Sequence, residues 1–390
     1  MMFAAVVTAV LSLLAWVWLT LCQGGFWRTD VRLPPRDGPA GGLREWPSVT
    51  VVVPARNEAG VLPVSLPSLL AQAYPGRVRV VLVDDNSDDG TAELARSLAG
   101  RHGGVPLEVV APGEPEPGWT GKLWAVRHGV ALARSEFVLL TDADIAHEPD
   151  SLAELVSAAV RADLDLVSLM ARLRVVTAWE RLVVPAFVYF FGQLYPFRWV
   201  NRPGSRTAAC AGGCVLVRRA ALERADAPAS IRHAVIDDVA LARAVKRSGG
   251  RIWLGLADRV HSVRPYPGLD ELWRMVARSA YAQLRYRLSL LAATVLGLVL
   301  VYLTPPLATV AGALSGDRVL FGVGAATWLL MSATYLPMLR YYGRTPWYAP
   351  LLPFTAGLYL VMTVDSAVRH HRGRGAAWKG RTYSAPSGTT

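Results

Sequence analysis

Four long runs of apolar residues constrain the fold of this 390-residue chain more than any other feature. One run lies at the N-terminus, at Met1–Leu21, and three lie in the C-terminal part, at Leu288–Leu314, Val319–Leu339 and Trp347–Val364. A helix of about 20 apolar residues crosses the roughly 30 Å hydrocarbon core of a bilayer. We therefore predict a multi-pass protein of the cell membrane, with a polar domain between the first run and the other three.

The N-terminal run is expected to remain as an anchor over residues 1–22. No Lys or Arg precedes its apolar residues, and no A-x-A cleavage signal precedes Cys22, so a cleaved signal peptide is disfavoured. Residues 23–47 are rich in Pro, Gly and Arg, a composition typical of a linker.

The basic charge of the chain follows the membrane segments. The formal net charge is +11, and arginines flank the apolar runs at Arg28, Arg32, Arg36, Arg278, Arg285 and Arg287. This distribution fits the positive-inside bias and predicts a cytoplasmic catalytic domain. Basic and aromatic residues do not alternate on one compact domain, so no nucleic-acid partner is expected. The three cysteines, Cys22, Cys210 and Cys214, form neither a disulfide framework nor a zinc set.

The C-terminal tail conflicts with a simple topology of three full C-terminal spans. It carries Arg369, Arg372, Arg374, Lys379 and Arg381, which three spans would place outside the cell. We therefore predict that one C-terminal run does not cross fully. Leu288–Leu314 is the first candidate, because Pro305-Pro306 would turn it back as a re-entrant hairpin. The alternative is Trp347–Val364, which Pro350 and Pro353 interrupt.

The polar part of the chain alternates between strand and helix patterns. Buried strands are predicted at 49–53, 78–83, 107–110 and 137–140, with helices near 60–73, 91–99 and 122–133 between them. Further on, a strand is predicted at 164–170, a glycine turn and strand at 210–217, a helix at 236–249 and a basic helix at 269–287. The alternation predicts an α/β domain over 48–277, with a Rossmann-like, mostly parallel sheet and right-handed crossovers. The basic helix and the membrane segments then make up residues 278–390.

Residues 181–200 depart from this pattern. They are apolar and aromatic, but Pro185 and Pro196 interrupt them and the segment is short for a span. We predict a helix that lies in the membrane interface, where aromatic rings gather. An ordinary core helix is the alternative.

Carboxylates follow the predicted strands. Glu58 follows the first, Asp84 and Asp85 follow the second, and Asp142 and Asp144 follow the strand at 137–140. Open α/β sheets bind ligands beyond the carboxyl ends of their strands. An Asp-x-Asp motif there offers hard oxygens to Mg²⁺ or Mn²⁺, which are usually shared with a phosphate. The alternative is helix capping, since Asp is common before helices.

An ordered set of motifs adds to this pattern. The set comprises PARNE (54–58), VDDNSDDGT (83–91), GK (121–122), TDAD (141–144), AGG (211–213) and IDDVAL (236–241). In this order the sequence resembles the family 2 glycosyltransferases of the GT-A fold. Within that family it is similar to the hopanoid-associated (hopene-associated) enzymes, through GWTGKLWA (118–125) and the tail WKGRTY (378–383). Ceramide glucosyltransferases are more distant relatives.

The resemblance implies a nucleotide-sugar donor site. The residues expected to contact the donor are Pro54, Arg56, Glu58, Asp84, Asp85, Lys122 and Asp142. Carboxylates accept hydrogen bonds from ribose hydroxyls and from uracil N–H, which suits a UDP-sugar. Lys122 begins a helix, and both its charge and the helix N-terminus favour a diphosphate. The alternative for Lys122 is a solvated surface lysine.

The resemblance also implies the chemistry. Asp144, with Asp142, is expected to hold Mg²⁺ or Mn²⁺ against the diphosphate, whose developing charge must be neutralised. Asp238 is expected to act as the general base toward an acceptor hydroxyl, with Asp237 beside it, where relatives often carry Glu. One base and one metal-bound leaving group imply direct displacement with inversion, on a membrane lipid acceptor. Helix capping by Asp237-Asp238 is the alternative and is compatible with catalysis.

One motif of the processive relatives is missing. The (Q/R)xxRW motif has no counterpart; the nearest text is Arg278–Tyr286, where Arg278 or Arg285 remains a candidate contact of the diphosphate. A single transfer is therefore favoured over a long polymer. The alternatives are a polyprenyl-phosphate or polysaccharide glycosyltransferase and, from other classes, a membrane nucleotidyltransferase or an inactive scaffold.

Overall fold

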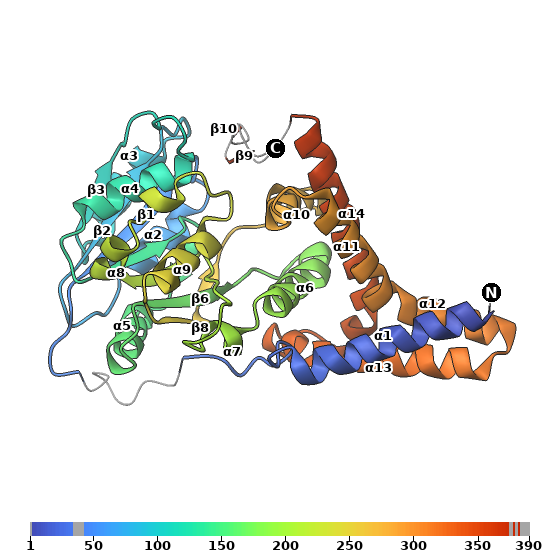
Figure 1. The fold of residues 1–390 in the computed structure, drawn as a ribbon. Helices are drawn as coiled ribbons and strands as arrows, with labels where there is room; N and C mark the ends of the chain where they lie inside the picture. Colours follow the sequence, from blue (N-terminus) through green and yellow to red (C-terminus); the bar gives the residue numbers. More distant parts are fainter. Residues whose placement is uncertain (1, 34–42, 374–376, 379–380, 383–390) are drawn as a thin grey trace. The chain divides into compact units, whose positions relative to one another are not determined.

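The computed structural model describes residues 2–33, 43–373, 377–378 and 381–382 (Figure 1). The chain forms two compact units, which are treated separately below. Among the described residues, the helical unit comprises 2–29, 175–198 and 266–373, and the α/β unit comprises 30–33, 43–174, 199–265, 377–378 and 381–382. Residues 175–198, which the sequence placed inside the α/β domain, thus belong with the apolar helices.

The α/β unit is built on an eight-stranded sheet in the order β3-β2-β1-β4-β7-β6-β8-β5. The strands are β1 (Val49–Ala55), β2 (Val78–Asp84), β3 (Leu107–Val110), β4 (Phe137–Thr141), β5 (Ile145–His147), β6 (Leu166–Arg172), β7 (Cys214–Arg218) and β8 (Ile252–Ser262). Strands β1 to β4 pair in parallel, as do β6 and β8. Strand β7 is antiparallel to β4 and β6, and β5 is antiparallel to β8. The predicted mostly parallel α/β sheet is confirmed.

Helices cover both faces of this sheet. They are α2 (Leu62–Leu70), α3 (Thr91–His102), α4 (Gly121–Leu132), α5 (Ser151–Arg161), α8 (Arg219–Arg224), the short η1 (Ala229–Ile231) and α9 (Asp237–Arg247). Residues of α2, α3 and α5 pack on the face that carries Val51 of β1. Neighbouring Val52 points to the other face, where α4 approaches closely at Gly129. A Cβ at Gly129 would lie 2.3 Å from Cγ1 of Val52, so only glycine permits this contact.

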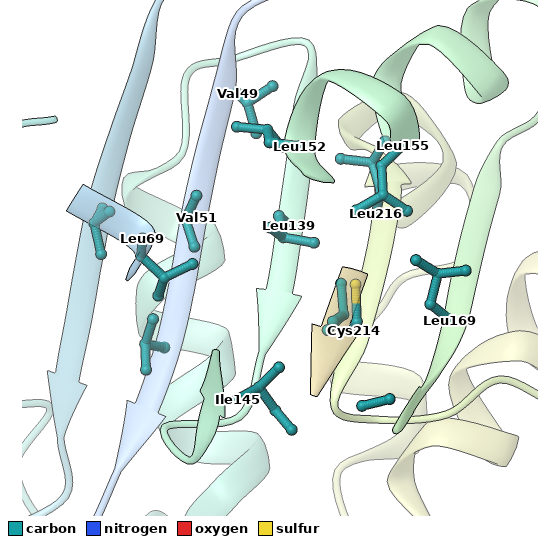
Figure 2. Packing of buried hydrophobic residues seen from close by; sticks show 14 of the residues in the cluster. Val49, Val51, Leu69, Leu139, Ile145, Leu152, Leu155, Leu169, Cys214 and Leu216 are labelled. Atoms are coloured by element: carbon teal, nitrogen blue, oxygen red, sulfur yellow. The ribbon is translucent and has the colours of Figure 1, made fainter. Parts of the chain in front are cut away.

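Buried side chains of α2 and α5 pack against one face of the sheet. Figure 2 shows Leu69 of α2 and Leu152 and Leu155 of α5 among side chains of β1, β4, β6 and β7. Full burial of such a side chain contributes about 1.5–3 kcal/mol. Strand β4 is buried along its whole length, as the apolar run predicts for a central strand. The rigid sheet therefore holds the residues after β1, β2 and β4 at one edge.

The helical unit contains the apolar runs. Its elements are α1 (Met2–Cys22), α6 (Ala178–Leu194), α10 (Leu269–Gln283), α11 (Leu288–Leu298), the π-helical turn η2 (Val299–Leu303), α12 (Thr304–Ser315), α13 (Arg318–Tyr341), the 3₁₀ turn η3 (Pro346–Leu351) and α14 (Leu352–His371). Four helical runs within the described residues are long and apolar enough to cross a membrane. They are Met2–Cys22, Leu288–Ser315, Arg318–Tyr341 and Pro346–His371. The short α7 (Phe197–Val200) lies where the chain passes between the units.

The predicted re-entrant hairpin at Pro305-Pro306 is wrong. The helical run continues from Leu288 to Ser315, because both prolines lie in the first turn of α12, directly after the π-helical turn η2. Proline is tolerated at a first helical turn, where its missing N–H is least costly. The carbonyl of Val301, four residues before Pro305, instead accepts a hydrogen bond from Nε1 of Trp16 on α1, at 2.6 Å. Pro350 and Pro353 likewise do not break the run Pro346–His371, and the number of true spans stays a prediction.

Helix α6 packs inside the helical unit. Its N-terminus has a capping box in which Glu180, fully buried, accepts from the backbone N–H of Thr177 at 2.8 Å and of Tyr266 at 2.8 Å. Further along, the buried Tyr189 hydroxyl lies 2.7 Å from the Thr334 hydroxyl on α13. Eight of the 17 residues of α6 are buried, and the location of the helix in the membrane interface stays a prediction.

The tail motif WKGRTY is described only in part. Residues Ala377–Trp378 and Arg381–Thr382 form the antiparallel pair β9 and β10. The rest of the motif, and with it Lys379, lies outside the described residues, as do Arg36 and Arg374.

Candidate active site

Six of the predicted site residues lie at the carboxyl edge of the sheet in two clusters of interacting residues. The first, called here the Arg264 cluster, contains Glu58, Asp144, Ser262 and Arg264. The second, called here the Lys122 cluster, contains Lys122, Asp142, Gly212, Asp237 and Asp238. Asp142 and Asp144 of the DAD motif thus point their carboxylates into different clusters.

In the Arg264 cluster, one guanidinium joins two carboxylates that come from different strands. The Arg264 Nη2 atom donates to both oxygens of Glu58, at 2.9 and 2.7 Å. Its Nε donates to Oδ2 of Asp144 at 3.0 Å, and the Ser262 hydroxyl donates to the same oxygen at 3.0 Å. The carboxylates are shielded from water, with side-chain exposures of 8% for Glu58 and 13% for Asp144.

The pairing of β5 with β8 brings these residues together. Strand β5 begins directly after the DAD motif, and Ile145 pairs with Ser262 at the end of β8. The backbone N–H of Val263 then donates to the Asp144 carbonyl at 2.9 Å. Arg264 follows one residue later and reaches both carboxylates. The sequence analysis missed Arg264 because it did not recognise the apolar stretch at 252–257 as a strand. The strand β5 that pairs with the end of β8 lies far away in the chain.

In the Lys122 cluster, one ammonium joins the DAD motif to helix α9. Lys122 is the second residue of α4, whose N-cap Thr120 accepts from the backbone N–H of Leu123. Its Nζ lies 2.9 Å from Oδ1 of Asp142 and 3.1 Å from Oδ2 of Asp237. With a side-chain exposure of 20%, Lys122 is not the solvated surface lysine of the alternative interpretation.

Asp238 lies beside this ion pair and is held by the backbone. Its Oδ2 accepts from the N–H of Gly212 at 3.1 Å, and its Oδ1 accepts from the N–H of Val239 at 2.7 Å. Gly212 belongs to the glycine turn that leads into β7. A Cβ on Gly212 would lie 3.5 Å from both Lys122 Nζ and the Cβ of Asp238. A bare backbone at this point therefore leaves room between the ammonium and the carboxylate.

The excess of negative charge shifts the proton affinities of this cluster. Burial and the neighbouring Asp237 carboxylate raise the pKa of Asp238 to about 6, against the lowering effect of Lys122. Burial alone would lower the pKa of Lys122, but the Asp142 and Asp237 carboxylates outweigh it and raise that pKa. Burial also raises the pKa of Asp142. A carboxyl that titrates near pH 6 is suited to general-base chemistry near neutrality.

The loops after β1 and β2 are bound to each other. The Ser87 hydroxyl donates to Asp84 and accepts from the backbone N–H of Asn57. Arg56 donates to the Asp85 carbonyl at 2.5 Å, and its guanidinium lies 3.6 Å from the fully buried Asp85 carboxylate. Asp84, Asp85 and Arg56 therefore stabilise one another beside Glu58. Their predicted contacts with a nucleoside stay predictions.

A cavity lies between the sheet and the helices α4 and α9. Its polar lining includes Lys122, Asp142, Asp237 and Asp238, and Pro54 of β1 also lines it. Its apolar lining includes Leu123 and Val126 of α4, Leu140 of β4 and Leu241 of α9. The Lys122 cluster thus lies in a concave, partly apolar site, as is typical of small-molecule sites. Arg278 belongs to the helical unit, in α10, and Arg285 follows that helix.

The carboxylates of the DAD motif fit a metal that is shared with a substrate. No group of three His, Cys, Asp or Glu side chains able to hold a metal occurs among the described residues. Mg²⁺ commonly takes only one or two protein carboxylates and completes its shell with phosphate oxygens and water. Asp142 and Asp144 supply two such carboxylates, so the donor set is compatible with Mg²⁺ or Mn²⁺ bound together with a diphosphate.

Comparison with known proteins assigns the family. Residues 47–282 match the model of the family described as "Glycosyltransferase like family 2", which is more than half of the chain. The chain belongs to glycosyltransferase family 2. A mannosyltransferase structure from Pyrobaculum calidifontis, in complex with GDP-Man and Mn²⁺, has the same fold. It covers 93% of this family 2 chain, and the chain covers 99% of it, with a TM-score of 0.57 and 21% identity.

Two curated relatives align over somewhat more than half of this chain. The probable glycosyltransferase YdaM of Bacillus subtilis is 27% identical over 222 residues, which is 54% of this chain and 51% of that protein. An undecaprenyl-phosphate 4-deoxy-4-formamido-L-arabinose transferase of Pseudomonas aeruginosa is 29% identical over 228 residues, 57% of this chain and 61% of that protein. The chain thus spans between half and two thirds of the length of these two relatives.

Proposed function

We propose that this protein transfers a sugar from a nucleotide-sugar to a hydroxyl group of a membrane lipid, with inversion at the sugar. The observation that carries the proposal is Asp238. Its carboxylate is held by two backbone N–H groups in a concave site, next to Lys122, and its pKa is raised to about 6. Family membership supports glycosyl transfer over the nucleotidyltransferase and scaffold alternatives.

Asp238 is the proposed general base. At pH 7 a carboxyl with a pKa of about 6 is largely ionised, yet it binds a proton more readily than an ordinary aspartate. It takes the proton of the acceptor hydroxyl while that oxygen attacks the anomeric carbon. Asp237 raises the proton affinity of Asp238 and pairs with Lys122. Direct attack of the acceptor oxygen on the anomeric carbon is one displacement and therefore inverts that carbon.

The donor is proposed to bind across both clusters. Pro54, Arg56, Glu58, Asp84 and Asp85 form the nucleoside end, and Lys122 with the DAD carboxylates forms the diphosphate end. Lys122 offers a positive charge at the first turn of α4, where N–H groups also favour anions. A divalent cation held by Asp142 and Asp144 would supply charge neutralisation for the leaving nucleoside diphosphate.

The proposal also concerns the nucleobase of the donor, the side of the membrane on which the catalytic domain lies, and the lipid acceptor. The carboxylates after β1 and β2 suit uridine, whereas the Pyrobaculum structure holds GDP-Man, so both nucleotides belong in the test. The arginines after the N-terminal run favour a cytoplasmic catalytic domain. A hopanoid-related acceptor rests on the resemblance of the motifs alone.

A polyprenyl phosphate is the second candidate acceptor. The Pseudomonas relative is named for transfer to undecaprenyl phosphate, and the four apolar helical runs suit an acceptor that lies in the membrane. The two candidates differ in their need for Asp238. A phosphate oxygen is already anionic and attacks without a base, whereas a hydroxyl requires one.

The experiment supplies membranes that contain the protein with labelled UDP-sugars and GDP-sugars. Sugar transfer predicts release of nucleoside diphosphate and label in the lipid fraction, and membranes with the Asp238→Asn variant serve as the control. Pyrophosphate release would instead indicate a nucleotidyltransferase. Label in lipid that is unchanged by Asp238→Asn would favour the phosphate acceptor. No label in any lipid with any donor would contradict the proposed function.

A further inference from the structure

Arg264 contacts Asp144, the carboxylate of the DAD motif that is expected to bind a metal. Arg264 itself lies outside all of the sequence motifs. Asp144 Oδ2 accepts hydrogen bonds from both Arg264 Nε and the Ser262 hydroxyl, each at 3.0 Å. A carboxylate oxygen has two lone-pair sites, and both are used here. A metal that binds Asp144 through this oxygen must displace at least one of these two donors.

Charge reinforces this competition. The guanidinium contacts both Glu58 and Asp144, and the Arg264 side chain is 28% exposed. A divalent cation at Asp144 would have to approach this positive charge closely, where unit charges 4 Å apart interact by several kcal/mol at the dielectric of a protein surface. The same holds at the other end of the motif, where the Lys122 ammonium lies 2.9 Å from Asp142.

We propose that Arg264 is a positioning residue that competes with the metal for Asp144, so that metal binds tightly only together with the donor diphosphate. This inference rests on the proposed use of a nucleotide-sugar and a divalent cation. A guanidinium binds phosphate oxygens with two parallel hydrogen bonds. The diphosphate therefore offers Arg264 another anionic partner at the same edge of the sheet, frees the Asp144 oxygen and adds ligands for the metal. Arg264 thus couples the binding of the two.

The same residue links the nucleoside end to the diphosphate end. Glu58 follows β1, beside the loops that hold Asp84 and Asp85, and its two oxygens accept from one Arg264 nitrogen. A movement of Arg264 from Asp144 to the diphosphate changes the partner of Glu58 as well. Donor contacts at Glu58 and metal contacts at Asp144 are then expected to depend on each other.

The test measures Mn²⁺ affinity of the full chain in detergent, from the electron paramagnetic resonance signal of free Mn²⁺, with and without UDP or GDP. Arg264→Gln removes the competing charge and is expected to tighten the binding of Mn²⁺ alone by about tenfold or more, the factor given by 1.4 kcal/mol. Arg264→Lys retains the charge and is expected to stay near wild type. Wild-type protein is expected to bind Mn²⁺ at least about tenfold more tightly when the nucleotide is present. In Arg264→Gln this difference is expected to be smaller, and the part that remains comes from the metal ligands that the diphosphate itself supplies.

Arg259→Gln is the matched control. Arg259 lies on the same strand β8 and also joins two carboxylates, Asp150 at 2.5 Å and Glu154 at 3.2 Å, but outside both clusters. Its removal is expected to leave Mn²⁺ affinity unchanged, and thermal unfolding of each variant checks that it is folded. Equal Mn²⁺ affinity of Arg264→Gln and wild type would overturn the proposal, as would wild-type affinity that does not respond to a bound nucleotide.

These readouts do not require sugar transfer. If metal and nucleotide binding are coupled through Arg264 but no sugar reaches any lipid, the inference stands and the proposed function fails. If sugar is transferred but Arg264→Gln does not alter Mn²⁺ binding, the function stands and the inference fails.

Discussion

The two charged clusters share one motif but differ in the balance of their charges. The Arg264 cluster opposes two carboxylates with one guanidinium that contacts both directly. The Lys122 cluster opposes three carboxylates with one ammonium, and the pKa of Asp238 rises to about 6. This difference in charge is the basis of the separate roles proposed for the two clusters. In the Arg264 cluster, the guanidinium exchanges partners when metal and diphosphate bind. In the Lys122 cluster, Asp238 accepts the proton while Lys122 contacts the diphosphate.

Removal of divalent metal should have the largest effect. EDTA is expected to abolish sugar transfer, and excess Mg²⁺ or Mn²⁺ to restore it, because the charge that develops on the diphosphate must be neutralised. The measurement is nucleoside diphosphate release in membranes. Full activity in the chelator would erase the proposed difference between the clusters, since Lys122 and Arg264 would then suffice to neutralise the leaving group.

The second largest effect is expected from loss of the general base, Asp238. Asp238→Asn is expected to lower kcat by roughly 10²–10⁴-fold, the usual contribution of a general base, while nucleotide-sugar binding stays near wild type. Single-turnover kinetics and a separate binding measurement distinguish the two. Asp237→Asn, in the same helical turn, is the matched control and should lose far less. Turnover close to wild type in Asp238→Asn, with a hydroxyl acceptor identified, would remove the assignment of the base.

In the Arg264 cluster, loss of a carboxylate is expected to weaken nucleotide-sugar binding. Asp144→Asn should weaken binding of the nucleotide-sugar in Mn²⁺ by at least roughly tenfold, since loss of even an outer partner of a metal ligand commonly costs 10–100-fold in affinity. Calorimetric titration with the donor tests this directly. If Asp144→Asn and Asp238→Asn impair the same kinetic parameter, the clusters do not have separate roles.

The smallest expected effect is a shift in pH dependence. The pKa of Asp238 is raised, so the base is ionised above about pH 6 and becomes protonated as the pH falls through that value. The rate should therefore fall on the acid side of about pH 6. Asp237→Asn removes one cause of the raised pKa of Asp238. The fall in rate on the acid side of the pH–rate profile should therefore move to lower pH, by up to about one unit. If the acid side of the profile does not move, burial alone raises the pKa of Asp238.

Local sequence patterns were sufficient for the parallel half of the sheet. The apolar run at 137–140 predicts β4, and the strands before it end within a residue or two of their predicted limits. Carboxylates after those strands had to share one edge, because parallel strands present their carboxyl ends together. Hence the order of strands and carboxylates in the sequence was enough to place Glu58, Asp142 and Asp144 near one another.

The partners of these carboxylates could not be predicted in the same way. Arg264 reaches Glu58 over 206 residues of chain, and it does so because β5 pairs with β8. Strand β5 has only three residues, too few to show a periodicity. Lys122 was singled out as a contact of the diphosphate, but its ion pair with Asp237 depends on where α9 packs.

In the helical unit, the effect of a proline pair also depended on residues far away in the chain. The pair Pro305-Pro306 reads locally as a break, and the hairpin predicted from it was wrong. A π-helical turn places the prolines at the start of α12, and the indole of Trp16, 285 residues from Val301 in the chain, bonds a carbonyl there. The sequence by itself determined the strands, the acidic edge and the apolar helices, because these depend on residues close together in the chain. Only the tertiary structure decided which cation meets which carboxylate and which donor satisfies which carbonyl, because such pairs form between segments that packing alone brings together.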